Sequence, residues 1–128
     1  MKEIKEADRL FSLLVRQEEA NDEGYSRCVT CGKIAHWRKQ HCGHFMPRQH
    51  MATRYDRMNV GTQCVTCNTF HEGRQFEFSQ FLNKKYGPGT ADELLLKSKM
   101  THKTSKAYLT LFIKELKKIL KAKGYETR

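Results

Sequence analysis

Four cysteines constrain this chain more than any other feature, because they form two identical CVTC pairs. Cys28 and Cys31 make the first pair, Cys64 and Cys67 make the second, and residues 32–63 lie between them. Zinc binds four thiolates as a tetrahedron, and each C-x-x-C turn places two sulfurs on one side of the metal. Four protein ligands leave no open position for a substrate. We therefore expect a structural zinc that holds together the base of the intervening segment.

The alternative interpretation of two C-x-x-C sequences is a pair of redox motifs. The first residues, MKEIKEADRL, are charged and contain no apolar run of the kind found in secretory signals. This favours the cytoplasm, where thiols more often bind metal than form disulfides. Cys42, the fifth cysteine, is expected to stay reduced. No apolar run approaches the roughly 18 residues of a membrane span, so a membrane protein is not expected.

The charge of the chain favours a polyanionic partner. The sequence contains 24 Lys and Arg against 14 Asp and Glu, a net charge of +10. Residues 1–24 hold four basic and seven acidic side chains, net −3, whereas residues 25–128 hold 20 and 7, net +13. Nucleic acid is the first such partner to consider. We expect it to contact the chain after the first helix.

A length of 128 residues indicates one domain, with an N-terminal helix in 1–24, a zinc-bound segment in 25–73 and a helical extension in 74–128. Helical periodicity predicts a first helix over about 4–20. Residues 25–64 lack this periodicity and contain several glycines, which is typical of short strands and loops. Later helices are predicted at about 64–73, at 76–86, from a capping box at Thr90–Glu93 to Leu96, and at Tyr108–Leu120. The last helix is expected to pack on the core with its lysines in solvent, or to place those lysines on phosphates.

The segment between the cysteine pairs is rich in histidine and arginine, including His36, His41, His44, His50, Arg38, Arg48, Arg54 and Arg57. Metal-assisted hydrolysis of a phosphodiester needs a base such as imidazole beside a divalent cation. Asn59 and Asn68 supply amide oxygens, and Asn68 directly follows Cys67, so the zinc site would hold it in a fixed position. These residue types together predict hydrolytic chemistry on a nucleic acid.

The order C-x-x-C, G-H-F-x-P-R, N-V and C-x-x-C-N resembles the HNH, or ββα-metal, nucleases. The string GHFMPRQHMATRYDRMNVGTQCVTCN is similar to the phage NinG (Rap) recombination nucleases, and the resemblance covers about residues 5–87. It implies an α+β fold in which a zinc-stapled ββα-metal finger is flanked by an N-terminal helix and C-terminal helices. It also implies roles for single residues: His44 as general base, Asn59 as the brace of the loop between the strands, Asn68 as ligand of a catalytic Mg²⁺ or Mn²⁺, and the paired cysteines as zinc ligands.

The chain departs from this pattern directly before the base. Many HNH enzymes have Asp or His there as a metal ligand, whereas Gly43 cannot bind a metal. His41 is the candidate substitute, but an offset of three along a strand places it on the opposite face from His44 unless the chain bulges at Gly43. His71 lies three residues after Asn68, on the same face of a helix. There it could bind the metal or the scissile phosphate.

The leading prediction is a divalent-metal-dependent HNH endonuclease that hydrolyses DNA. By resemblance, its substrate is a branched recombination intermediate such as a Holliday junction, in phage or prophage recombination within a bacterial cell. Arg48 and Arg54 are expected to hold flanking phosphates, with Arg38 and His71 also on the DNA side. Cutting both strands of a junction requires two active sites, which favours a homodimer.

Two other functions stay open. One is a non-catalytic, zinc-stapled DNA-binding module, for which Gly43 is the best support. The other is a protein-interaction adaptor whose apolar last helix, Tyr108–Leu120, binds a recombination partner.

Overall fold

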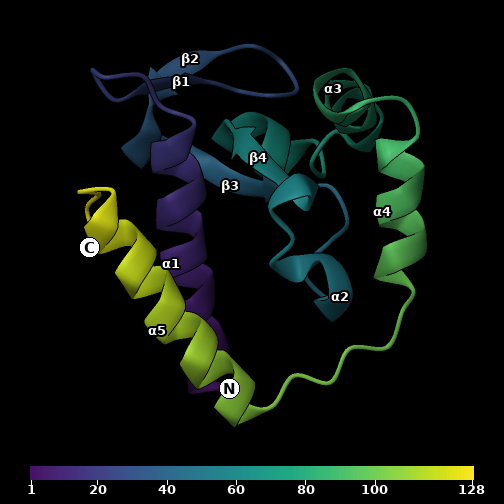
Figure 1. The fold of residues 1–128 in the computed structure, drawn as a ribbon. Coiled ribbons are helices and arrows are strands. Elements are labelled where there is room, and N and C mark those ends of the chain that lie inside the picture. The colour runs from purple at the N-terminus through teal and green to yellow at the C-terminus, as the bar shows by residue number, and fades with distance from the viewer.

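Helix α1 (Lys2–Glu18) is the first element of the chain. It packs against residues from the middle of the chain and against the last helix (Figure 1). The computed structural model describes residues 1–128. Apolar residues recur along α1 at helical spacing, so one side of the helix is buried: Ala7, Leu10, Phe11, Leu13, Leu14 and Val15. The helix predicted over 4–20 is confirmed, with both ends two residues earlier.

Two small antiparallel sheets follow α1. Strand β1 (Tyr25–Arg27) pairs with β2 (Ile34–His36), and the first cysteine pair lies in the turn between them. Strand β3 (His41–His44) pairs with β4 (Val60–Gln63). Short helical turns fill the connections, namely η1 (Trp37–Lys39), α2 (Met51–Arg54) and η2 (Arg57–Asn59). The prediction of short strands and loops in this region is therefore confirmed.

The second cysteine pair leads from β4 into a short π-helical turn, η3 (Thr66–Phe70). This turn is shorter than the helix predicted over 64–73. The chain then reverses through Glu72, Gly73 and Arg74, whose φ angles are 51°, 84° and 48°. Left-handed backbone of this kind ends a right-handed helix, and only glycine adopts it freely. Helix α3 (Gln75–Tyr86) begins directly afterwards and matches its prediction closely.

Two helices complete the chain. Helix α4 (Thr90–Ser98) begins at Thr90 itself, with Gly89 at the N-cap in the left-handed region, so the predicted capping box is wrong. The Thr90 hydroxyl donates to the carbonyl of Gly87 instead of accepting from the helix. Helix α5 (Lys106–Ala122) follows a segment that runs along the lower edge of the view and returns the chain to α1 (Figure 1). No helix combines the length and the apolar character needed to cross a membrane.

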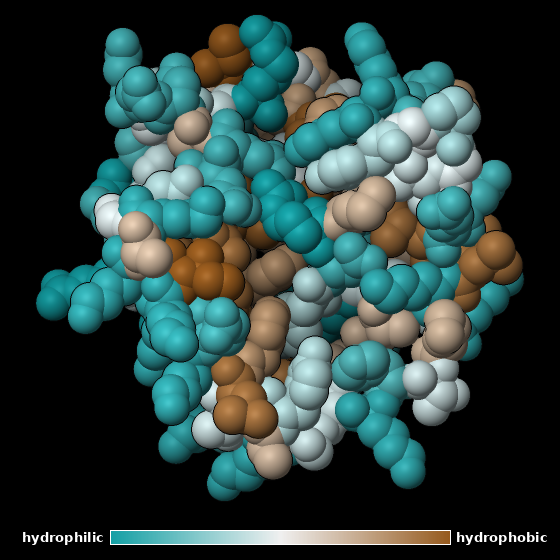
Figure 2. All heavy atoms as spheres, viewed as in Figure 1, coloured by the Kyte–Doolittle hydropathy of each residue, from teal (hydrophilic) through white to brown (hydrophobic).

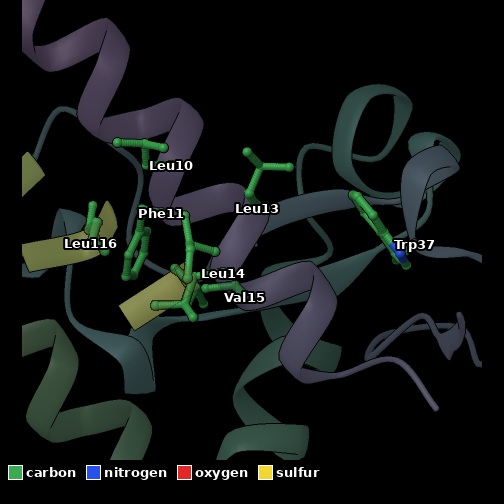
Figure 3. Close-up of a cluster of buried hydrophobic side chains, with 9 residues drawn as sticks. Leu10, Phe11, Leu13, Leu14, Val15, Trp37 and Leu116 are labelled. Carbon is green, nitrogen blue, oxygen red and sulfur yellow. The ribbon is translucent and has the colours of Figure 1, made fainter. Parts of the chain in front are cut away.

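The main hydrophobic core lies between α1, α5 and the β3–β4 sheet (Figure 3). Its buried members are Leu10, Phe11, Leu13, Leu14, Val15, Trp37, Val60, Leu116 and Leu120. A second core joins Phe45, in the loop after β3, to Phe78, Leu82, Ala91 and Leu94 of α3 and α4. The expectation that the last helix packs on the core is confirmed, because its apolar stripe meets α1 while Lys114, Lys117, Lys118 and Lys121 are exposed. The chain therefore combines helices with two small sheets in an α+β fold.

Candidate functional site

The four paired cysteines converge on one point between the β1–β2 turn and the β4–η3 junction. Their sulfur atoms all lie within 4.8 Å of one another. The Sγ atoms of Cys31 and Cys64 are 3.7 Å apart. Zinc–sulfur bonds of about 2.3 Å in a tetrahedron place neighbouring sulfurs about 3.8 Å apart. The cluster can therefore hold a structural zinc, as the spacing of the two pairs predicts.

Hydrogen bonds around the cluster suit thiolate sulfurs. Arg74 Nε donates to Cys67 Sγ at 3.2 Å, and the backbone N–H of Cys67 donates to Cys64 Sγ at 3.5 Å. Burial by itself would raise the pKa of Cys28, but hydrogen bonds from the Thr30 side chain and from backbone N–H groups lower it to about 6. Such outer donors stabilise the charge that metal ligation requires.

A polar groove of about 660 Å³ lies beside β3. This strand is hydrogen-bonded to β4 on one side only, so its other edge is open. Residues of α1 line one part of the groove, and residues from Asn68 to Gln75 line another. Only two of the 15 lining residues are hydrophobic, which suits a charged or polar ligand. The groove brings together five predicted site residues: His41, His44 and Asn68, and the predicted DNA-binding residues Arg38 and Arg48.

His44 stands at the end of β3 with one ring nitrogen fixed. Its Nε2 lies 3.0 Å from the backbone carbonyl oxygen of Arg54. Because a carbonyl oxygen only accepts, Nε2 carries the proton and Nδ1 keeps its lone pair. Burial lowers the pKa of His44 below its ordinary value of 6.5, even though the bond to Arg54 opposes this shift. A neutral imidazole with a free Nδ1 can accept a proton near neutral pH.

Asn59 is fully buried behind this histidine, where it braces the loop between β3 and β4. Its Oδ1 accepts from the backbone N–H of Met46 at 2.8 Å. Its Nδ2 donates to the carbonyls of Met46 and Thr53 at 3.0 and 3.1 Å. Thr53 directly precedes Arg54, whose carbonyl orients His44. Asn59 therefore positions the histidine through the backbone and does not itself line the groove.

Asn68 and His41 contact each other in the wall of the groove. Nδ2 of Asn68 lies 3.0 Å from Nδ1 of His41. The pairing of β3 with β4 is one-to-one from His41 opposite Gln63 to His44 opposite Val60, so the chain does not bulge at Gly43. His41 and His44 line the same groove without a bulge, so the expectation that a bulge is needed is wrong. Both line the groove because it runs along the open edge of the strand.

A close neighbour on β4 explains why residue 43 is a glycine, and the sequence does not reveal it. A Cβ atom at this position would lie 2.0 Å from Oε1 of Gln63. Gln63 is fully buried, and its Nε2 donates to the Gly73 carbonyl at 2.8 Å and to Thr30 Oγ1 at 3.1 Å. Its Oε1 has no hydrogen-bond partner. The Gln63 carboxamide thus fills the space that a side chain on residue 43 would need.

The predicted DNA-binding arginines have partners within the chain. Arg54 Nη2 contacts Asp8 of α1 at 2.6 Å, and only 13% of the Arg54 side chain is exposed. Arg48 lies 3.4 Å from the same carboxylate and is 61% exposed, so it stays accessible to a ligand. Arg38 lines the groove and pairs with Glu126 near the C-terminus. The sequence predicts that Arg54 holds a DNA phosphate, whereas in the structure Arg54 pairs with Asp8 of α1.

His71 is the one predicted DNA-side residue that the structure leaves outside the groove and without an ion pair. It is exposed at the end of η3, whereas Asn68 lines the groove. A π-helical turn has more residues per turn than an α-helix. His71 therefore does not share the groove with Asn68, and a contact of His71 with the metal or the phosphate stays a prediction.

Comparison with known proteins gives a match for nearly the whole chain. No curated protein and no solved structure matches it. The family model described as Bacteriophage Lambda NinG protein matches residues 2–126. This span takes in α1, the cysteine cluster, the groove and α5. The chain therefore belongs to the bacteriophage lambda NinG protein family.

Proposed function

We propose that this protein is a divalent-metal-dependent DNA endonuclease of the HNH type that acts in phage recombination. The observation that carries the proposal is the groove beside β3, where an oriented, neutral histidine shares a polar wall with His41 and Asn68. The order of β3, a braced loop, β4 and a helical turn on a cysteine cluster supports a ββα-metal finger. Membership of the NinG family supports the role in recombination.

His44 supplies the base in this mechanism. Its Nδ1 removes a proton from a water molecule, and the resulting hydroxide attacks the phosphorus in line with the leaving oxygen. The Arg54 carbonyl stabilises the imidazolium that forms, because Nε2–H already donates to it. Asn59 keeps that carbonyl in place through its bond to Thr53. The geometry therefore prepares His44 for one proton transfer without a carboxylate partner.

Asn68 and His41 are the residues that would hold the catalytic cation. An amide oxygen and an imidazole nitrogen are both metal ligands, and Mg²⁺ or Mn²⁺ binds amide oxygen readily. In the structure Asn68 Nδ2, not the amide oxygen, lies 3.0 Å from His41 Nδ1. A half-turn of the Asn68 amide would bring its Oδ1 to the same place, so that Oδ1 and the imidazole could hold one cation. The bound cation supplies stabilisation of the negative charge on the leaving oxygen.

The substrate class rests on charge and on the family. A net charge of +10 suits a DNA backbone, and the resemblance to recombination nucleases favours branched DNA such as a four-way junction. Two cuts in one junction would be made by two copies of the chain, so a homodimer belongs to the proposal. A phage protein of this kind would act in the cytoplasm of the bacterial host.

The test is a cleavage assay on labelled four-way junction and linear duplex, with Mg²⁺, Mn²⁺ or EDTA. Wild-type protein should cut in the presence of either cation and not in EDTA. His44→Ala should lower the rate by roughly 10² to 10⁴-fold, the usual contribution of a positioned base, while zinc content and DNA affinity stay unchanged. His102→Ala is the matched control, because His102 is exposed in the segment before α5. Wild-type cleavage by His44→Ala would contradict the mechanism.

The ligand variants separate the two roles further. Asn68→Ala should also lose cleavage, and a higher Mn²⁺ concentration should restore part of it, because the base is still present. His41→Ala decides whether this histidine binds the cation: a loss that depends on metal concentration assigns it as a ligand. Cleavage by His41→Ala at the wild-type rate would remove it from the site.

A non-catalytic DNA-binding module is the second candidate, and Gly43 favours it. The Gln63 carboxamide fills the space beside the base and leaves no room for a ligand on residue 43. Binding to DNA without cleavage in either cation would support this function. The adaptor hypothesis has less support, because Leu109, Leu116 and Leu120 of the α5 stripe are buried and only its first residue, Tyr108, is exposed, at 43%. On the face in Figure 2, apolar residues form separate patches within a largely hydrophilic surface.

A further inference from the structure

Arg16 of α1 is a partly buried arginine that lines the groove and forms no ion pair. The other two arginines of the groove, Arg38 and Arg48, pair with Glu126 and Asp8. Removing a cation from water without an opposite charge costs free energy. Burial accordingly lowers the pKa of Arg16. An uncompensated cation in a groove indicates that an anion binds beside it.

The guanidinium of Arg16 is held rigidly from one side. Its Nε donates to the Ser12 carbonyl at 3.2 Å and to Ser12 Oγ at 2.8 Å. Its Nη1 donates to the Trp37 carbonyl at 3.2 Å, and the guanidinium carbon lies 5.2 Å from the Trp37 ring centroid. A guanidinium has five N–H donors, so both on Nη2 and one on Nη1 have no partner in the chain. Nη2 is not among the enclosed polar atoms, which leaves it open to a ligand.

The position of Arg16 relates it to the candidate site. Asp8, Ser12 and Arg16 are spaced four residues apart, so they form one stripe of α1 along the groove. Asp8 contacts Tyr55 and Arg54, next to the carbonyl that orients His44. Arg16 contacts Trp37, only four residues before His41. Helix α1 therefore places its free arginine at the His41 end of β3.

We propose that Arg16 binds a phosphate oxygen of the DNA strand in the groove, at the end where His41 meets Asn68. The proposal rests on the proposed function, since it takes DNA as the ligand. A guanidinium with free donors on both Nη atoms can hold one phosphate through two parallel hydrogen bonds. Arg16 thus gives the acidic first helix a contact with DNA, whereas the charge distribution places DNA on residues after that helix.

The test measures DNA affinity in EDTA over a series of salt concentrations, so that binding is observed without cleavage. Arg16→Gln should weaken binding to a labelled duplex by roughly 10-fold and reduce the slope of log K against log salt by about one, because one phosphate contact is lost. Arg16→Lys should keep the slope, because the charge remains, but cut DNA more slowly in Mg²⁺. Arg9→Gln is the control, since Arg9 is on the same helix, is exposed and pairs with Glu6.

The melting temperature separates this role from a structural one. Arg16→Gln loses hydrogen bonds to Ser12 and Trp37 but also relieves the desolvation of an unpaired cation, and because these two effects oppose each other the melting temperature should stay close to that of the wild type. A purely structural Arg16 would lower that temperature and leave the salt slope unchanged, and that result would overturn the proposal. Wild-type protein that binds DNA but does not cut it would remove the proposed function alone. An unchanged slope for Arg16→Gln, with cleavage intact in the wild type, would remove the Arg16 assignment alone.

Discussion

Gly43 and Gln63 form a matched pair of residues beside the candidate base. The Gln63 carboxamide is held by two donated hydrogen bonds, so it cannot move aside cheaply. A side chain at residue 43 would meet its Oε1, Cδ and Cγ at 2.0, 2.6 and 2.8 Å. The glycine is therefore required by packing, because any other residue here needs a different neighbour on β4.

We predict that Gly43→Ala destabilises the protein by roughly 1–3 kcal/mol, the usual cost of an overpacked core position. The same substitution should cost less in a Gln63→Ala background, because the clashing carboxamide is then absent. Urea unfolding of the four proteins in this double-mutant cycle measures the coupling. Costs that simply add would show that the two residues do not restrict each other.

The pH dependence of cleavage provides the second prediction at this scale. Burial lowers the pKa of His44 below 6.5, so the unprotonated base persists into mildly acidic solution. As the pH falls through this lowered pKa, His44 gains a proton and kcat/KM should decline. Above it, the rate should be independent of His44 protonation. Cleavage rates from pH 4.5 to 8, with DNA affinity measured in parallel, place the midpoint. A midpoint above 6.5 that tracks His44 would contradict the buried environment.

The role of a residue could be predicted from the sequence where the residue stands in a short motif with a characteristic spacing. The cysteine pairs, His44 and Asn68 stand in short motifs, and the structure brings the cysteines into one cluster and lines one groove with His44 and Asn68. Arg16 and Gln63 were missed because their roles depend on partners 21 and 33 residues away. Nothing in their immediate neighbourhood distinguishes them from other polar residues.

At the scale of elements, α1 is attached to the segment between the strands by charge as well as by apolar packing. Asp8 accepts from Arg54 Nε at 3.0 Å, from Arg54 Nη2 at 2.6 Å and from the Tyr55 hydroxyl at 2.8 Å. Near the other end of the helix, Glu18 and Glu19 accept from Arg57 at 3.0 and 2.8 Å. Acidic residues of 1–24 therefore form ion pairs with arginines of the later, basic part of the chain.

We predict that Asp8→Asn lowers the free energy of unfolding at pH 7 by roughly 1.5–3 kcal/mol, since it removes the charge that receives these hydrogen bonds. Burial alone would raise the pKa of Asp8, but the bonds from Arg54 and Tyr55 outweigh it and hold the pKa below its ordinary value of 3.8. The stabilisation is thus present above 3.8 and is lost as the pH falls through the lowered pKa.

Urea unfolding at several pH values checks this prediction. The difference between wild type and Asp8→Asn should be greatest near neutral pH and should shrink in strong acid. Asp22→Asn is a suitable control, because Asp22 is exposed in the turn after α1 and takes part in no ion pair. A difference that is constant down to acid pH would mean that Asp8 acts through its shape and not its charge.

Elements were predicted well where an apolar stripe determines them, as in α1, α3 and α5. Prediction failed where the course of the backbone depends on left-handed φ angles and not on an apolar stripe. Glu72 and Arg74 adopt positive φ, although sequence alone gives no reason to expect this of non-glycine residues. The helix after the second cysteine pair is consequently short, which moves His71 away from the groove.

At the scale of the whole molecule, three separate buried clusters stabilise the fold. The main core joins α1 and α5 to Trp37 and Val60. The second core ties Phe45 to α3 and α4. The third cluster consists of cysteines alone. It joins the β1–β2 turn to the start of η3, whereas the second core reaches this turn only from its edge, through the partly buried Val29.

The last prediction follows from this division. Removal of zinc by a chelator, or Cys64→Ser, should unfold mainly residues 25–73, because a structural zinc supplies much of the folding free energy of such a segment. The groove would be lost with it, since Asn68 directly follows Cys67. Hydrogen exchange should therefore become fast in β1 to β4, while α1 and α5 keep more protection through their apolar contact. Cys42→Ser is the control, because Cys42 lies outside the cluster. A chain without zinc that retains slow exchange throughout 25–73 would show that packing alone holds this segment together.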